Sequence, residues 1–346
     1  MKSRYDALGM SGRETEVHRF WLLPDRFTAA VFAAVVLAVV LPCRGEGARW
    51  VEIGSNVAIA VLFFLQGARL SRAAVFNATL HWRLHVIILG ATFVVFPLLG
   101  LTLNPLSGTL LPQPLYIGLL FLCCLPSAVQ ASVVFTSVAG GNVAAALCSA
   151  SLSSILGIVL TPLLGNLLLQ AQGNLSVNSL QSIAVHLLLP FVAGQIAQGA
   201  IRGWMRRHEK LVRTVDRVSV YLMVYAVISA ATISGAWSLL PASGFLVLVL
   251  VDGALLLTML GVTAFAARCF GLSPQDEIAI VFCGSKKSLV TGIPMASMLF
   301  PDASPGLIVL PLMIFHQLQL MTCAMLAQRY ALGGVEGAPR SVTAAS

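Results

Sequence analysis

The chain has 346 residues, of which 58% are hydrophobic and only 10% charged, and its mean hydropathy is +0.90. A soluble domain carries about 25% charged residues, so this composition excludes an ordinary soluble protein and indicates an integral membrane protein. The formal net charge of +8 does not indicate nucleic-acid binding, because the basic residues lie in short segments between apolar runs. We expect neither a cleaved signal peptide nor a disulfide framework, since most of the seven cysteines lie inside apolar runs.

Ten apolar runs follow one another along the chain, between a polar, basic tail at 1–26 and a second tail at 332–346. A turn-rich linker at 171–182 separates a first set of five runs (27–170) from a second set of five (183–331). Read as membrane-spanning helices, the runs are 27–41, 53–70, 84–103, 115–138, 143–169, 183–201, 218–239, 245–265, 277–300 and 306–326.

The distribution of Lys and Arg predicts the orientation of these helices. With ten spans, one side of the membrane carries 17 of the 21 basic residues, most densely in a predicted loop at 202–217. The other side carries only Arg44 and Arg49. By the positive-inside rule both termini are expected in the cytoplasm, in the plasma membrane or, for a bacterial protein, the inner membrane.

The ninth run holds the remaining two basic residues, Lys286 and Lys287, at its middle. A charge at this depth costs roughly 2.5–3.5 kcal/mol on insertion scales. Gly284, Gly292 and Pro294 flank the lysines and weaken a helix. These features predict a discontinuous helix whose gap holds two cations. The alternative is a cytoplasmic loop between two stretches that are each too short to span a membrane.

Five spans on each side of a linker predict that the second set is inserted upside down relative to the first. The fourth run should then be interrupted like the ninth, and Pro126, Gln130 and Ser132 do interrupt it. We therefore predict an all-α integral membrane protein of ten transmembrane helices in two inverted five-helix repeats, with discontinuous helices 4 and 9 crossing at mid-membrane.

Three motifs carry a family resemblance that extends over about residues 25–331. They are Ala139-Gly-Gly-Asn-Val143, Phe282-Cys-Gly-Ser-Lys-Lys-Ser288 and Leu310-Pro-Leu-Met-Ile-Phe-His-Gln317. With them the chain resembles the bile acid:sodium symporter superfamily (solute carrier family 10), and within it the SBF-like subgroup that includes the divergent seventh vertebrate member. The resemblance implies a panel of helices 1, 2, 6 and 7 and a core of helices 3, 4, 5, 8, 9 and 10.

The chain departs from the sodium-coupled members of this superfamily at most of the expected sodium-binding positions. Where those members have an acidic residue and a glutamine on helix 9, this chain has Phe282 and Lys286. The other positions are occupied by Ser132-Val133 on helix 4, Ala146 and Ala150 on helix 5 and Thr92 on helix 3. Sodium coupling is therefore expected to be altered or absent, and a fixed ammonium group is expected to replace the coupling cation.

Polar residues inside the apolar runs are the candidate site residues. The candidates for binding an anionic substrate are Lys286, Lys287, Gln130, Ser132, Asn142, Ser288 and Thr291. The candidates for ion or proton coupling are Ser285, Lys286, Thr136, Ser149, Asp252, His316 and Gln317. Two other roles stay open, namely hydrogen bonding that repairs the broken helices and an ion pair between a lysine and Asp252. No set of residues has the spacing of a metal site.

The function predicted from these features is secondary-active transport of a small organic anion by alternating access. A non-transporting membrane sensor or regulator on the same scaffold is the alternative. An enzyme is not expected, since adjacent Ser285 and Lys286 cannot face each other on a helix as a catalytic pair. We expect the lipid bilayer as surroundings and no cofactor other than, at most, sodium. A homodimer stays open.

Overall fold

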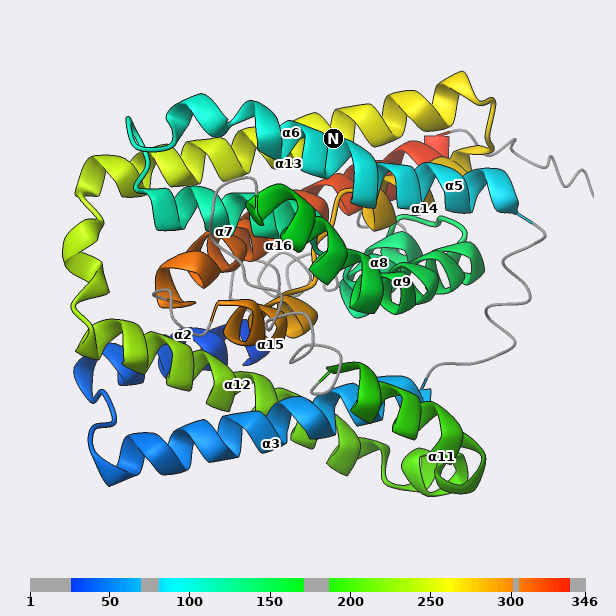
Figure 1. Cartoon of the computed structure of the whole chain (residues 1–346). Helices are drawn as coiled ribbons and strands as arrows, with labels where there is room; N and C mark the ends of the chain where they lie inside the picture. Colours follow the sequence, from blue (N-terminus) through cyan, green and yellow to red (C-terminus); the bar gives the residue numbers. More distant parts are fainter. Residues whose placement is uncertain (1–25, 70–80, 171–186, 301–304, 337–346) are drawn as a thin grey trace, which may run out of the picture.

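The computed structural model describes residues 26–69, 81–170, 187–300 and 305–336. The predicted linker at 171–182, nearly all of the first predicted tail and residues 337–346 of the second lie outside these residues. Within them every regular element is a helix, as the apolar runs predict (Figure 1).

The helices of the first half follow the predicted spans closely. They are α2 (Arg26–Val40), α3 (Glu46–Arg69), α5 (Trp82–Gly90), the π-helical segment η3 (Ala91–Val95), α6 (Phe96–Thr102), the short turn η4 (Asn104–Leu106), α7 (Gln113–Cys124), α8 (Val129–Val138) and α9 (Val143–Gln170). The segments α5, η3 and α6 continue one another, whereas α7 and α8 meet at an angle of 62°.

The helices of the second half are α11 (Leu189–Arg207), α12 (Glu209–Ile233), the short turn η6 (Ala236–Leu239), α13 (Ala242–Cys269), α14 (Pro274–Gly284), α15 (Leu289–Leu299) and α16 (Pro305–Glu336). Of these, α12, α13 and α16 are longer than hydropathy predicts. The predicted loop at 202–217 is wrong, because α11 and α12 extend through it and only His208 separates them. Arg and Lys are good helix formers outside the bilayer, and an ion pair between Arg213 and Glu209 supports the first turns of α12.

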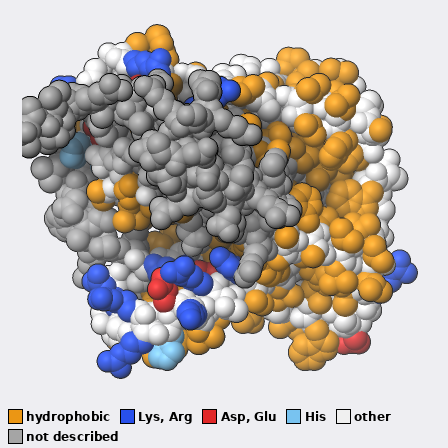
Figure 2. All heavy atoms as spheres, turned by 180° about the vertical axis from the view of Figure 1, so that it is seen from behind, with side chains coloured by type: hydrophobic (Ala, Val, Ile, Leu, Met, Phe, Trp, Pro, Cys, Tyr) orange, Lys and Arg blue, Asp and Glu red, His pale blue; other side chains and the backbone are white. Residues whose placement is uncertain are grey.

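Among the described residues, six helical segments are long and apolar enough to cross a membrane, or seven if the bent pair α7–α8 forms one span. They are Glu46–Arg69, Trp82–Leu106, Val143–Leu168, Ala242–Cys269, Pro274–Leu299 and Gly306–Leu332. The helices at predicted spans 1, 6 and 7 are not among them. Figure 2 shows hydrophobic side chains over much of one face, while Lys and Arg gather mainly toward one end. The chain is thus a multi-pass membrane protein, and the count of ten spans stays a prediction.

The helices form two groups that contact each other mainly through α12. In one, α11 packs against α3 and α12 against α2 (Figure 1). The contact between α3 and α11 is backbone to backbone: a Cβ atom on Gly67 would lie 2.1 Å from the Phe191 carbonyl oxygen, and one on Gly194 would lie 2.1 Å from that of Phe64. Small residues at such crossings permit the closest helix approach. The other group consists of α5–α9 and α13–α16, and it contains the interrupted helices.

Candidate functional site

Two interrupted helices meet at the centre of the second group, as the sequence predicts. The first interruption separates α7 from α8 at 125–128, and the second separates α14 from α15 at 285–288. Hydrogen bonds join the two, from Ser288 N to Pro126 O (3.0 Å), from Ser127 Oγ to Cys283 O (2.7 Å) and from Ser132 Oγ to Phe282 O (2.9 Å). Each interruption therefore supplies hydrogen-bond partners for the other.

Lys287 lies in the second interruption, and its side chain is completely buried. Its ammonium group lies 4.0 Å from the centre of the Phe96 ring. It donates three hydrogen bonds to backbone carbonyl oxygens, those of Thr92 (3.0 Å), Cys123 (2.8 Å) and Leu125 (2.7 Å). We call these three oxygens the carbonyl cradle. An ammonium group has three N–H donors, so the cradle satisfies Lys287 fully.

The Thr92 carbonyl is free because the helix is locally wound as a π-helix. The Phe96 N–H bonds to Ala91 O, five residues back, rather than to Thr92 O. In the π register Thr92 O would pair with residue 97, which is Pro97 and has no N–H. The sequence thus leaves one buried acceptor at this level of the helix, and Lys287 occupies it.

The other two oxygens of the cradle lie at the C-terminal end of α7, where the last carbonyls of any helix lack intrahelical partners. The Ser127 N–H, which could have served Cys123 O, bonds instead to Ser153 Oγ (3.0 Å), and Cys124 O accepts from Thr161 Oγ1 (2.8 Å). The ammonium group of Lys287 takes the remaining acceptors. A cation at this position also compensates the negative end of the dipole of α7.

Lys286 is equally buried but less completely bonded. Its ammonium group donates to Ala131 O (3.1 Å) and lies 3.6 Å from the centre of the Phe135 ring and 5.1 Å from that of Phe282. Ala131 belongs to the first turn of α8, and the residue before that helix, Ala128, gives it no side-chain cap. The positive charge of Lys286 therefore lies close to the positive end of a helix dipole.

Gln319 on α16 completes the second interruption, although it was not among the predicted site residues. Its Oε1 accepts from Lys287 N (2.9 Å), and its Nε2 donates to Lys287 O (3.0 Å) and lies 2.9 Å from Nδ1 of His316. The spacing of Gln319 could have indicated this role, because residues three apart share a helix face and Gln319 lies three residues after the candidate His316. The predicted Gln317 is only half-buried.

Four predicted hydroxyl groups serve the broken backbone in this conformation. Ser285 Oγ bonds back to Val281 O, Ser288 caps α15 by accepting from Thr291 N, and Thr291 Oγ1 bonds to Ser288 Oγ. Ser132 Oγ donates to Phe282 O in the other interrupted helix. Repair of the interrupted helices therefore accounts for these contacts, and a role in binding a substrate or ion stays a prediction for each of them.

The remaining predicted residues lie apart from the two lysines or make no polar contact with them. Asn142 bonds Asp276 Oδ1 (2.8 Å) and Ala145 N (3.0 Å), and Ser149 Oγ lies 2.7 Å from Nδ1 of His85. Gln130 is exposed on α8, and the buried hydroxyl of Thr136 has no hydrogen-bond partner among the described residues. Neither carboxylate oxygen of Asp252 has one either, so the alternative of an ion pair between Asp252 and a lysine is not formed.

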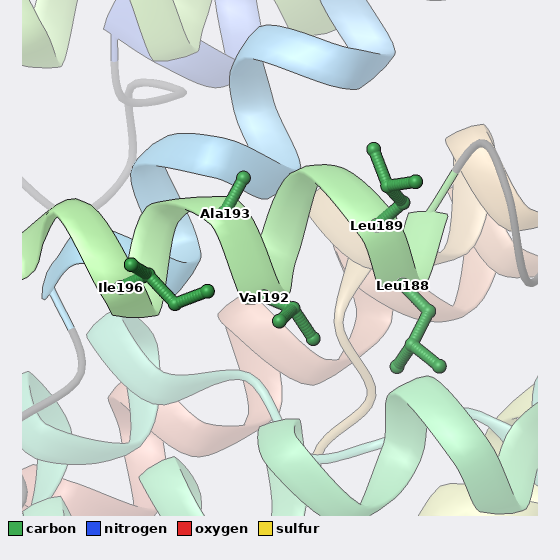
Figure 3. A pocket seen from close by; sticks show the side chains of 5 residues that line it. All are labelled: Leu188, Leu189, Val192, Ala193 and Ile196. Carbon is green, nitrogen blue, oxygen red and sulfur yellow. The ribbon is translucent and has the colours of Figure 1, made fainter.

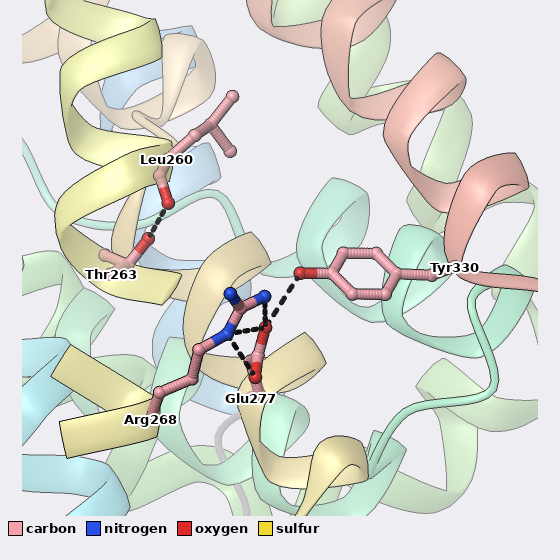
Figure 4. Close-up of polar contacts among 5 residues, drawn as sticks. All are labelled: Leu260, Thr263, Arg268, Glu277 and Tyr330. Carbon is pink, nitrogen blue, oxygen red and sulfur yellow. Dashed lines mark hydrogen bonds and ion pairs between the residues drawn. The ribbon is translucent and has the colours of Figure 1, made fainter. Parts of the chain in front are cut away.

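An aromatic and ionic chain leads from Lys286 toward the Arg268 end of the molecule. The Phe282 ring meets the Tyr330 ring edge to face at 6.3 Å. Tyr330 Oη donates to Glu277 Oε1 (3.2 Å), which also accepts from Arg268 (Figure 4). These contacts tie α13, α14 and α16 together, and the Phe282 ring separates Lys286 from the ion pair.

Neither a hollow along α11 nor the metal-ligating side chains of the described residues offer an alternative site for an anion or a metal ion. A shallow hollow along α11 is lined by aliphatic side chains alone, of which Leu188 and Val192 point to the same side of the helix (Figure 3). It contains no group that would bind an anion. No group of three or more His, Cys, Asp or Glu residues in the described ranges could hold a metal ion.

Comparison with known proteins shows the family to which the chain belongs. Residues 25–332 match the SBF-like CPA transporter family. An uncharacterized protein of Pseudomonas aeruginosa (PA2026) is 50% identical over 89% of this chain and 93% of its own length. The putative symporter YfeH of Escherichia coli is 46% identical over 88% and 92%, and the sodium/bile acid cotransporter 7 of Rattus norvegicus is 32% identical over 79% and 81%. The chain belongs to the SBF-like CPA transporter family, within the bile acid:sodium symporter superfamily.

Proposed function

We propose that the chain is a secondary transporter that moves a small organic anion across the plasma membrane, or the bacterial inner membrane, by alternating access without requiring sodium. Membership of a transporter family and the names of relatives support transport. The name of the rat relative refers to sodium and bile acid, so bile acids are the first anions to test. The names do not decide the substrate or the coupling ion of this chain.

The observation that carries the proposal is the position of Lys286 at the start of α8. Its ammonium group is completely buried and contacts the first turn of α8, whose N–H groups have no side-chain cap. No acidic side chain forms an ion pair with Lys286 among the described residues, and the Phe135 and Phe282 rings offer only partial compensation. An anionic group of a substrate would neutralise this charge and accept from the helix terminus.

The carbonyl cradle supports the second part of the proposal, independence from sodium. Backbone carbonyl oxygens at 2.7–3.0 Å from a cation are what a bound alkali ion would also use, and here they bind the tethered ammonium of Lys287. A second unit charge about 4 Å away would cost about 4 kcal/mol at an effective dielectric constant of 20. We therefore expect that Lys287 provides permanently what a bound cation would provide reversibly.

The architecture we propose for this function is ten helices in two inverted repeats, with both termini in the cytoplasm. One internal correspondence supports it. Ser127 lies three residues after the end of α7, and its N–H bonds to Ser153 on α9. Lys287 lies three residues after the end of α14, and its N–H bonds to Gln319 on α16. In alternating access, the group containing α2, α3, α11 and α12 would move against the group that holds the crossing.

Uptake into proteoliposomes tests the proposal. We expect saturable uptake of a labelled bile acid, or of an anion found by thermal-shift screening, at equal rates in sodium and potassium at constant ionic strength. Lys286→Gln should weaken substrate binding more than ten-fold, since one lost charge-assisted contact is worth about 1.5–3 kcal/mol. Lys287→Gln should weaken it to a different degree. A sodium requirement together with unchanged binding by Lys286→Gln would contradict both parts, and ligand binding without flux would favour a sensor.

A further inference from the structure

Asp252 on α13 is an acidic side chain with no exposed surface. Both of its carboxylate oxygens lack a hydrogen-bond partner among the described residues. The other acids on the elements nearby differ from it, since Glu277 is bonded to Arg268 and Asp276 to Asn142. Asp252 thus combines complete burial with a carboxyl group that makes no hydrogen bond or ion pair to any described residue.

An ionised carboxylate in such a place is strongly unfavourable, because neither solvent nor a partner compensates its charge. The neutral, protonated acid avoids most of this cost. A leucine or methionine would fill the same position without any cost of this kind, so the carboxyl group does not serve the stability of this conformation. Groups that reduce stability locally are commonly found where function requires them.

The neighbouring groups do not provide a permanent counter-charge. The elements packed against α13 are α5, η3, α14 and α16. Their charged or titratable residues have other contacts or lie near the Arg268 end of α13, about 24 Å along the helix from Asp252 at 1.5 Å per residue. Those whose side chains the structure describes are Arg83, His85, Asp276, Glu277, Cys283, His316, Cys323, Arg329 and Tyr330. The thiol of Cys123 on α7 is buried as well, and no Lys or Arg of the described residues forms an ion pair with Asp252.

We propose that Asp252 is a proton-binding site whose carboxyl group carries a proton in this conformation and releases it when a rearrangement around α13 brings the group into contact with water. One O–H bond breaks, the proton passes to water, and the carboxylate remains. The reverse step restores the buried, neutral acid. Protonation itself does not depend on the proposed transport function. Its role, coupling proton movement to the conformational cycle of the transporter, rests on that function.

Infrared spectroscopy of the purified full-length protein at neutral pH tests the protonation directly. We expect a carbonyl band of a protonated carboxyl group that disappears in Asp252→Asn, a variant that keeps the size of the side chain and mimics its neutral form. The control Glu277→Gln removes an acid that is paired with Arg268 and should leave the band unchanged. A spectrum in which Asp252→Asn loses no protonated-carboxyl band would overturn the proposal.

Uptake of a radiolabelled bile acid into proteoliposomes with an imposed pH gradient tests the coupling. We expect the gradient to change the uptake rate of the wild type several-fold, and the rate of Asp252→Asn to be the same with and without it. A gradient dependence that persists in Asp252→Asn would overturn the coupling role. If no variant transports the anion, the proposed transport of that anion fails, while the infrared result still decides whether Asp252 holds a proton.

Discussion

Replacing Lys287 by methionine tests the carbonyl cradle most directly, because the variant keeps an unbranched apolar side chain and removes only the cation. Three buried carbonyl oxygens would lose their donor. A buried acceptor left unsatisfied costs about 1–3 kcal/mol. Relief from burying a charge offsets part of this total. We expect a net loss of about 2–4 kcal/mol in the free energy of unfolding, which corresponds to a melting temperature lower by about 3–6 °C.

Lys286→Met is the matched control, since the two lysines are adjacent, equally buried and differ in their hydrogen bonds. Lys286 donates to one carbonyl oxygen against three for Lys287. Its replacement should lower the melting temperature by less than half as much. The assay is thermal unfolding of detergent-purified protein, followed by circular dichroism or thiol labelling of buried cysteines. Equal losses for the two variants, or no loss for Lys287→Met, would show that the cradle does not stabilise the fold.

Three further predictions use the same assay or a labelling experiment. Gln319→Leu leaves the backbone N–H and C=O of the second interruption unpaired and should cost about 2–4 kcal/mol, whereas Gln317→Leu on the half-buried side of α16 should change stability by less than about 0.5 kcal/mol. Gly194→Ala places a Cβ atom 2.1 Å from a carbonyl oxygen and should destabilise strongly or prevent folding, whereas Gly199→Ala on the same helix meets nothing within 4 Å and should be neutral or stabilising. A cysteine at Arg207 should react with an impermeant reagent only from the cytoplasmic side, and labelling from outside would contradict the predicted orientation.

The interruptions of the two helices could be predicted from the sequence because the residues that cause them are chemically distinctive. Pro126 lacks an N–H, and the lysines cannot stay in a continuous lipid-facing helix. Helix ends were less accessible, as the wrong loop at 202–217 demonstrates. Hydropathy reports where a helix leaves the apolar layer, whereas the helix itself ends where its backbone hydrogen bonds end. Basic residues mark where a helix leaves the apolar layer, but they do not end its backbone hydrogen bonds.

The contacts of Lys287 could not have been predicted, although its importance could. Adjacent helical residues point about 100° apart, so the two lysines cannot both face the crossing in the same way, and nothing in the pair says which one does. The choice depends on three backbone oxygens, and every residue has such an oxygen. What makes these three available is the π-helical register above Pro97 and the diversion of the Ser127 N–H to Ser153. Such long-range diversions become visible only once the helices are packed.

The hydrogen bonds at the crossing make the two interruptions mutually dependent, and this has a consequence for any motion of the protein. Ser127 in the first interruption and Ser132 on α8 donate hydrogen bonds to carbonyl oxygens at the end of α14. Lys287 in turn donates to a carbonyl oxygen at the end of α7. Moving one broken helix away from the other would leave several buried carbonyl oxygens unsatisfied at once, at about 1–3 kcal/mol each. Separating them is therefore far more costly than moving both as one body. The conformational change of the transporter is accordingly expected between this body and the packed helices α2, α3, α11 and α12, which contact it mainly through α12.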